Sequence, residues 1–256
     1  MARRVDSDLR DSVIYLYGVT QSPAGAAPSV AGVDGQSRIQ TIDCAGMVCW
    51  VSHVPAAEYG EKFSQNLEDM DWLAAVSLRH QRAVGAIAES HDMLPARLGT
   101  VFLTEDSLQA DIRRRKASLK RDLQRIAGMQ EWGVKIFASP QQTVLPTKMK
   151  TGREYLEAKS QMLRVRKPAV PDEEVKKLAS ELAKLGAATA EGGKISGGAR
   201  DLQYQVSVLV KKADRKKLEQ LLRRFSREWK DRRKIECSGP WAPYSFVSHE
   251  GSSKSE

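Results

Sequence analysis

The sequence predicts an α+β protein built from two ferredoxin-like α/β sandwich domains with antiparallel sheets, the second one modified by long paired helices. Three observations support this prediction. Short runs rich in β-branched and aromatic residues alternate with longer runs in which apolar residues recur every three or four positions. This series of strands and helices starts again near residue 128, after a complete first set. The chain has 256 residues, 41% of them hydrophobic, which suffices for two cores.

The first half of the chain predicts four strands and two helices. Asp69 lies where an acidic cap begins a helix with an apolar stripe, and this helix ends near Ser90. A second amphipathic helix runs from Glu105 until Gly128 stops it. The second and third strands form a tight hairpin around Ala45-Gly46. The expected strands are residues 13–17, ending at Gly18, residues 39–43, residues 47–54 and residues 101–103.

The second half predicts a similar unit with a glycine-rich break. Residues 186–198 are expected to be a flexible connector, because Gly192-Gly193-Lys194 lacks the rest of a phosphate loop: Ala188 and Ile195 stand where glycine and a hydroxyl residue are required. The expected elements are a strand at 132–137, helices at 152–165 and 172–185, a strand at 204–210, a basic helix and a strand at 234–237.

These patterns give a provisional domain organisation. The expected parts are a disordered N-terminus over residues 1–12, an N-terminal α+β domain over 13–128, a C-terminal α+β domain over 129–238 and a tail over 239–256. The long paired helices make the internal topology of the second domain depart from the simplest ferredoxin-like plan.

The net charge of +9 comes almost entirely from one segment. Residues 211–234 contain 12 Lys and Arg side chains against four acidic ones, a local charge of +8. Apolar residues recur there with helical spacing, so we expect a surface helix with a basic outer face. A nucleic-acid-binding module that uses this helix is the alternative function. A solvated helix face is the favoured interpretation, because no aromatic residues lie among the cations, and nucleic acid is therefore an unexpected partner.

No catalytic, cofactor-binding or metal-binding residues are predicted. The four histidines have no ligand spacing among themselves or with the three cysteines, which are read as reduced thiols of a cytoplasmic protein. His80 lies on an apolar helix stripe, where a hydrogen-bonded core or interface histidine is favoured over a proton-transfer role. Residues 12–33, the longest uncharged stretch, contain Pro23 and Pro28, so no membrane partner is expected.

Five segments are explained neither by charge nor by periodicity. They are Tyr15-Leu16-Tyr17-Gly18, Asp71-Trp72-Leu73 with His80, residues 94–102, residues 131–135 and residues 238–246. In this order and at these intervals they resemble the gas vesicle protein F and L family (GvpF/GvpL) over about residues 13–246. The C-terminal Gly-Pro-Trp-x-Pro-Tyr-Ser-Phe is the most specific piece, and Pro-x-Arg-x-Gly-Thr supports it. Ala242 stands where a second proline is common, and Leu98 where an aromatic residue is frequent.

The resemblance implies an accessory protein without enzymatic activity. Such a protein supports gas vesicle assembly and binds the hydrophobic gas vesicle shell protein and other gas vesicle accessory proteins. It is expected in the gas vesicle, on the gas-facing side of the shell, and in the cytoplasm before assembly.

Nine residues of these segments are the candidates for partner binding or domain docking. Two prolines of the C-terminal piece hold an extended backbone, and its three aromatic residues supply apolar area that docks back onto the domains or contacts the partner, with docking favoured. The turn before residue 101 is shaped by proline and glycine, and its arginine pairs with an acidic neighbour or contacts the partner. The candidates are Pro95, Arg97, Gly99, Trp132, Pro240, Trp241, Pro243, Tyr244 and Phe246.

Overall fold

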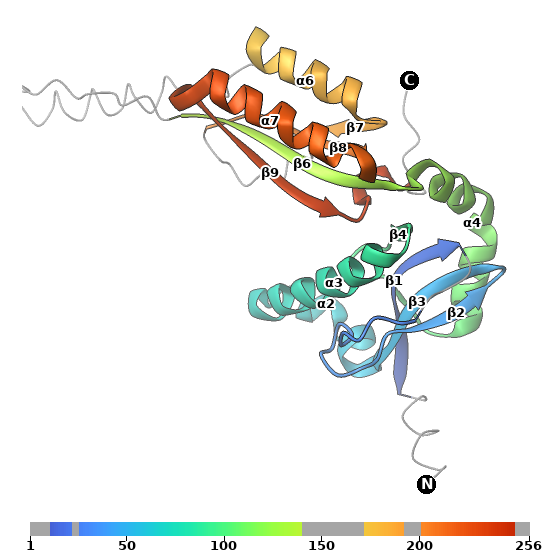
Figure 1. The fold of residues 1–256 in the computed structure, drawn as a ribbon. Coiled ribbons are helices and arrows are strands. Elements are labelled where there is room, and N and C mark those ends of the chain that lie inside the picture. The colour runs from blue at the N-terminus through green and yellow to red at the C-terminus, as the bar shows by residue number, and fades with distance from the viewer. Residues whose placement is uncertain (1–10, 22–25, 140–171, 192–200, 249–256) are drawn as a thin grey trace, which may run out of the picture. The chain divides into compact units, whose positions relative to one another are not determined.

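The computed structural model describes residues 11–21, 26–139, 172–191 and 201–248. The chain divides into two compact units, shown in Figure 1: unit 1 comprises residues 1–130 and 241–256, and unit 2 comprises residues 131–240. The class is α+β with two sheets, as predicted. The division differs from the expected one at the C-terminal end, where the last described residues join unit 1 and form no separate tail. The expected helix at 152–165 lies outside the described residues.

Unit 1 contains an antiparallel sheet in the order β2-β3-β1-β4, with β5 also paired to β1. Ala45 and Gly46 join β2 to β3 with φ values of 58° and 78°, the left-handed conformation that a two-residue hairpin turn needs. The predicted hairpin is thereby confirmed. The strands are β1 (Ser12–Gln21), β2 (Gln40–Cys44), β3 (Met47–Pro55), β4 (Met93–Pro95) and β5 (Val101–Phe102).

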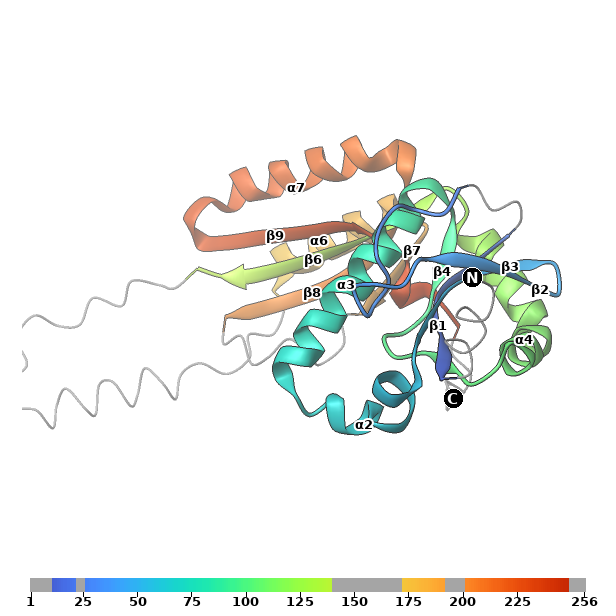
Figure 2. The same ribbon diagram turned by 90° about the horizontal axis from the view of Figure 1, so that it is seen from below.

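Two long helices, α3 (Met70–Ser90) and α4 (Glu105–Ile126), cover opposite faces of this sheet. Tyr15 and Tyr17 belong to the core that α3 covers, whereas Leu16 between them lies beside Leu119 of α4. Figure 2 shows the two helices on either side of β1. Both helices were predicted, and the cap is confirmed because the Asp69 carboxylate accepts hydrogen bonds from the first-turn amides of α3. Unit 1 thus differs from the predicted ferredoxin-like sandwich, in which the helices all pack on one face of the sheet.

Three features of unit 1 depart from the sequence-based expectation. β1 does not end at Gly18 but continues to Gln21. Gly18 leaves no room for a side chain beside β4, since a Cβ there would lie 2.5 Å from the Leu94 carbonyl oxygen. The short strand β4 was not predicted. Nor were two short helical segments before α3, η1 (Ala57–Glu61) and α2 (Phe63–Asn66).

Unit 2 contains a four-stranded sheet in the order β7-β8-β6-β9, with both helices over one face. Val134 and Ile136 of β6 share a buried core with Leu178 of α6 and with Leu222 and Phe225 of α7. Over the described residues this is the strand order of a ferredoxin-like sandwich, without the departure from the simplest plan that the paired helices predicted; one of those helices, at 152–165, lies outside the described residues. The elements are β6 (Met129–Ala138), α6 (Glu173–Leu185), β7 (Ala188–Glu191), β8 (Leu202–Lys211), η2 (Lys212–Asp214), α7 (Arg215–Trp229), η3 (Lys230–Arg232) and β9 (Arg233–Trp241).

The glycine-rich stretch is not a flexible connector throughout. Ala188–Glu191 form the edge strand β7, which pairs antiparallel with β8 so that Ala188 faces Leu209. Gly186 allows this turn because a Cβ there would lie 2.5 Å from Val208. Residues 192–200, which include the Gly192-Gly193-Lys194 sequence, lie outside the described residues.

Candidate functional site

The C-terminal segment, residues 241–248, packs onto unit 1. Ala242 and Phe246 are 7% and 6% exposed, and Tyr244 packs against the core that α3 covers. Pro243 is buried, and its carbonyl accepts a hydrogen bond from the Phe246 amide in the short helix η4 (Tyr244–Phe246). The segment therefore completes the core of unit 1 from the far end of the chain.

A chain of hydrogen bonds connects this segment to three other parts of unit 1. The Gly99 amide donates to the Tyr15 hydroxyl at 3.0 Å, and this hydroxyl lies 3.0 Å from His80 Nδ1. His80 Nε2 lies 3.0 Å from the Tyr244 hydroxyl. One imidazole thus links β1, α3 and the C-terminal segment, and through Tyr15 also the loop after β4.

Burial keeps His80 neutral at physiological pH. Desolvation lowers the pKa of His80 to about 4, although a hydrogen bond to the Ala96 backbone works in the opposite direction. Desolvation also raises the pKa of Tyr15 above its ordinary value. A charged imidazole would donate from both nitrogens. It would leave the Tyr15 hydroxyl, which already accepts from Gly99, without an acceptor among the described residues.

A second set of polar contacts joins the C-terminal segment to α4. The buried Asp122 carboxylate accepts from the Ser248 amide at 2.8 Å and from its hydroxyl at 3.0 Å. Arg125 pairs with Asp122 at 3.0 Å and donates to the Phe246 carbonyl. The segment therefore contacts helices on both faces of the sheet.

The loop between β4 and β5 carries three of the predicted residues. Pro95 is buried opposite Gly18 in the pairing of β4 with β1. Gly99 has φ = +77°, and a Cβ there would lie 2.4 Å from the ring of Phe63. Arg97 is exposed, and its side chain has neither a hydrogen bond nor an ion pair with the residues that the structure describes.

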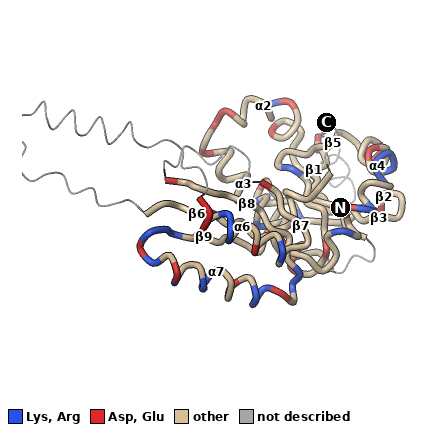
Figure 3. The backbone as a smooth tube through the Cα atoms, turned by 90° about the horizontal axis from the view of Figure 1, so that it is seen from above, with Lys and Arg blue, Asp and Glu red and all other residues tan. Residues whose placement is uncertain are grey.

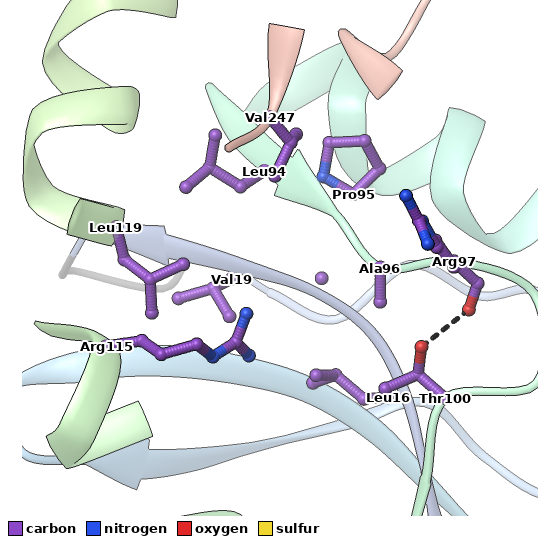
Figure 4. A pocket seen from close by; sticks show the side chains of 11 residues that line it. Leu16, Val19, Leu94, Pro95, Ala96, Arg97, Thr100, Arg115, Leu119 and Val247 are labelled. Atoms are coloured by element: carbon purple, nitrogen blue, oxygen red, sulfur yellow. Dashed lines mark hydrogen bonds between the residues drawn. The ribbon is translucent and has the colours of Figure 1, made fainter. Parts of the chain in front are cut away.

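A cavity of about 130 Å³ lies beneath this loop, between β1, β4 and α4 (Figure 4). Its walls are mostly aliphatic, and Arg97 and Arg115 are its charged lining residues. Arg115 pairs with Asp111 of the same helix at 2.5 Å. The Thr100 hydroxyl donates to the Arg97 carbonyl at 2.8 Å, which shapes the rim.

The remaining predicted residues are Trp132, Pro240 and Trp241. Trp132 is 6% exposed in the core of unit 2, where the Arg215 guanidinium lies 5.5 Å from its ring centre. Pro240 belongs to β9 and follows Gly239, whose φ of +130° permits close approach to Trp132. Trp241 is 41% exposed. The structure therefore brings together Pro95, Arg97, Gly99, Pro243, Tyr244 and Phe246 in unit 1, and not Trp132 and Pro240.

Residues of this site that were absent from the predicted set include Tyr15, Asp122, Arg125 and Ser248. Asp122 carried a recognisable signal, because it is an acidic residue on the apolar stripe of α4, next to Leu123. His80 was predicted to be a hydrogen-bonded core histidine, and this is confirmed. No local pattern could identify its tyrosine partners.

Ion pairs compensate part of the charge of the basic segment, residues 211–234. α7 buries its apolar face in the core of unit 2, and Figure 3 shows acidic residues among its more numerous cations. These ion pairs occupy half of the 12 Lys and Arg side chains of residues 211–234, and a cation held in an ion pair is less free to neutralise a phosphate. The ion pairs are Arg215 with Glu219, Lys217 with Asp214, Arg224 with Glu181 and Glu228, Arg232 and Arg233 with Glu174, and Lys234 with Glu236.

The described residues show two further absences. They contain no group of three or more His, Cys, Asp or Glu side chains placed to hold a metal ion. Among the helices within the described ranges, none has the length and hydropathy of a membrane span.

Fold and site together define a protein of two α+β units in which a returning C-terminal segment completes the first unit. Crystal structures of the gas vesicle protein GvpF share this fold. The protein from Anabaena sp. PCC7120 matches 93% of this chain and 97% of its own, with a TM-score of 0.68 and 18% identity. The protein from Microcystis aeruginosa matches 93% and 99%, with a TM-score of 0.67 and 18% identity.

The sequence identifies the family. Residues 13–248 match the profile of the gas vesicle synthesis protein GvpL/GvpF family, and the chain belongs to this family. Gas vesicle protein L of Streptomyces sp. (strain CB03234) is 28% identical over 251 residues, 93% of each chain. Gas vesicle protein F2 of Halobacterium salinarum is 26% identical over 143 residues, which are 54% of this chain and 60% of that protein. The protein therefore has a role in gas vesicles.

Proposed function

We propose that this protein binds the hydrophobic shell protein of the gas vesicle through unit 1 and supports vesicle assembly. The observation that carries this proposal is the distribution of exposed apolar side chains. All the large hydrophobic residues that are exposed within the described ranges belong to unit 1. They are Leu67, Met70, Leu78, Leu98, Leu103 and Trp241.

We take five of these residues as the candidate contact residues: Leu67, Met70, Leu78, Leu98 and Leu103. Phe63 of α2 packs against Gly99, next to Leu98, and Leu67 follows Phe63 by one helical turn. α2, which precedes α3, and the loop after β4 are therefore neighbours. Leu67 and Leu98 therefore lie on neighbouring segments, and exposed apolar residues that lie near one another mark an interaction surface.

Such a surface would cover exposed apolar area of the shell protein. A small hydrophobic shell protein that is free in solution exposes apolar area and aggregates. Shielding several hundred Å² at about 25 cal/mol per Å² is worth many kcal/mol before the cost of association is subtracted. This chemistry needs no catalysis and no cofactor. We place the protein with the shell protein and other accessory proteins in the vesicle, and in the cytoplasm before assembly.

Two charged substitutions test the proposal. Met70→Asp and Leu103→Asp alter side chains that are 72% and 74% exposed, so folding should change little while capture of the shell protein falls. Gln220→Asp adds the same charge to the exposed side of α7 in unit 2 and is the control. The measurement is co-elution with purified shell protein in size-exclusion chromatography, together with the rate at which the shell protein precipitates.

Binding of the shell protein by the wild type tests the proposed function. Binding by the Met70→Asp and Leu103→Asp variants tests whether these exposed residues form the contact. A wild-type chain that neither co-elutes with the shell protein nor slows its precipitation contradicts the proposal. Capture that persists in high salt supports apolar contact, whereas RNA binding that weakens steeply with salt would support the nucleic-acid alternative.

A further inference from the structure

We infer that the cavity under the loop after β4 receives one aliphatic side chain of the bound protein, while Arg97 binds a carboxylate next to it. This inference rests on the proposed function, because it specifies which kind of segment of the shell protein unit 1 recognises. The partner segment is thus an aliphatic residue adjacent to Asp or Glu.

The size of the cavity selects a side chain over a free ligand. At about 130 Å³ it is close to an engineered cavity of about 150 Å³ that binds benzene. Pockets for cofactors and drug-sized ligands measure about 300 to 1,000 Å³. One leucine or isoleucine side chain is therefore a suitable occupant.

The walls select an apolar occupant. Leu16, Val19, Leu94, Leu119 and Val247 line the cavity, and Figure 4 shows them around a common space. An aliphatic group placed against these side chains removes apolar surface from water, which is favourable. The transfer of a leucine side chain from water into such surroundings contributes about 1.5 to 3 kcal/mol.

The rim selects the charge of the neighbouring residue. Arg115 is already neutralised by Asp111, with N–O distances down to 2.5 Å. Arg97 has no ion pair within the described part of the chain, so its guanidinium is the uncompensated charge at the cavity. A planar guanidinium binds a carboxylate through two parallel hydrogen bonds and repels Lys or Arg.

Two variants and one control test the inference with purified shell protein. Arg97→Glu reverses the rim charge, and Ala96→Leu fills the cavity from its own wall. Arg113→Glu makes the same charge change on the exposed side of α4. We expect each of the first two variants to weaken binding at least about tenfold, because one loses the charge pair and the other the apolar pocket. The control should stay within about twofold of the wild type, and all melting temperatures should remain similar.

A second measurement separates the cavity from the proposed function. Methyl groups of Leu and Val are labelled in the full chain, and the shifts of Leu94 and Leu119 are followed by NMR. The peptide probes are acetyl-Leu-Glu-amide and acetyl-Leu-Lys-amide. We expect larger methyl shifts with the acidic peptide in the wild type, and loss of this preference in Arg97→Glu.

The outcomes are distinguishable. If the wild type fails to bind the shell protein but the acidic peptide shifts the cavity methyls, the proposed function is wrong and the cavity site stands. If the wild type binds the shell protein while both variants bind equally well and neither peptide shifts the methyls, the cavity inference is overturned and the function stands.

Discussion

His80 holds together parts of the chain that are 164 residues apart, because each of its ring nitrogens contacts a different tyrosine. The contact with Tyr15 joins α3 to the central strand, and the contact with Tyr244 joins α3 to the C-terminal segment. His80 itself is buried, and this burial disfavours the imidazolium ion. The histidine is thus a structural link whose strength depends on pH.

We expect the stability of unit 1 to fall as the pH is lowered from 7 to 4. The pKa of His80 is about 4 in the folded state against 6.5 in the unfolded state. Between these values the unfolded chain binds a proton that the folded chain does not, so acid favours unfolding. The full difference is about 3 kcal/mol and is reached below pH 4. The measurement is the free energy of unfolding by urea as a function of pH.

The control for this prediction is His80→Gln, which keeps a donor and an acceptor but does not titrate. The difference in stability between wild type and variant should change by about 3 kcal/mol over this pH range. An NMR titration in which the His80 ring protonates near pH 6.5 would contradict the prediction.

The sequence predicted that His80 is buried and hydrogen bonded, but it did not predict its hydrogen-bond partners. Its place on the apolar stripe of a helix indicated burial, and a buried imidazole must be hydrogen bonded. The partners come from β1 and from the C-terminal segment. Their proximity depends on how the whole unit folds, and no local spacing records it.

Elements were predicted where local chemistry decides the structure. α3 and α4 have caps and a continuous apolar stripe, and the β2–β3 hairpin has a two-residue turn with positive φ. β4 and β7 were missed for one reason. They have only three and four residues, and β7 contains a single β-branched side chain, so each becomes a strand through pairing with its long neighbour.

One substitution at two glycines should have opposite effects, because the elements around them differ. Gly99→Ala places a Cβ against the Phe63 ring at a position with φ = +77°, so we expect a loss of at least about 1 kcal/mol. Gly85 is an exposed residue within α3, with open space around its Cα, so Gly85→Ala should stabilise by about 0.5 to 1 kcal/mol. Urea unfolding measures both values. Destabilisation of similar size in both variants would contradict this view of the loop.

At the scale of the molecule, unit 1 is discontinuous in sequence. The chain leaves it after Gln130, forms the whole of unit 2, and returns at Trp241. The sequence predicted two α+β sandwiches from the repeated order of strands and helices. It placed residues 239–256 in a tail and favoured docking of the tail's aromatic residues onto the domains. It did not identify the receiving residues, such as His80 and Asp122, because they lie far away in the sequence. Periodicity describes one element at a time, and closure of a unit by a distant segment leaves no periodic signal.

This discontinuity predicts that weakening the returning segment destabilises unit 1 alone. Asp122→Ala removes the acceptor of both Ser248 hydrogen bonds and the partner of Arg125. Loss of contacts to a buried charge costs about 2 kcal/mol. Hydrogen exchange should therefore speed up by more than tenfold in α3 and α4, and remain unchanged in α6 and α7, whose core is separate. The control is Asp106→Ala in the exposed first turn of α4, with an effect below about 1 kcal/mol. Equal acceleration in the helices of both units would show that they unfold as one cooperative body, and the returning segment would then stabilise the entire chain.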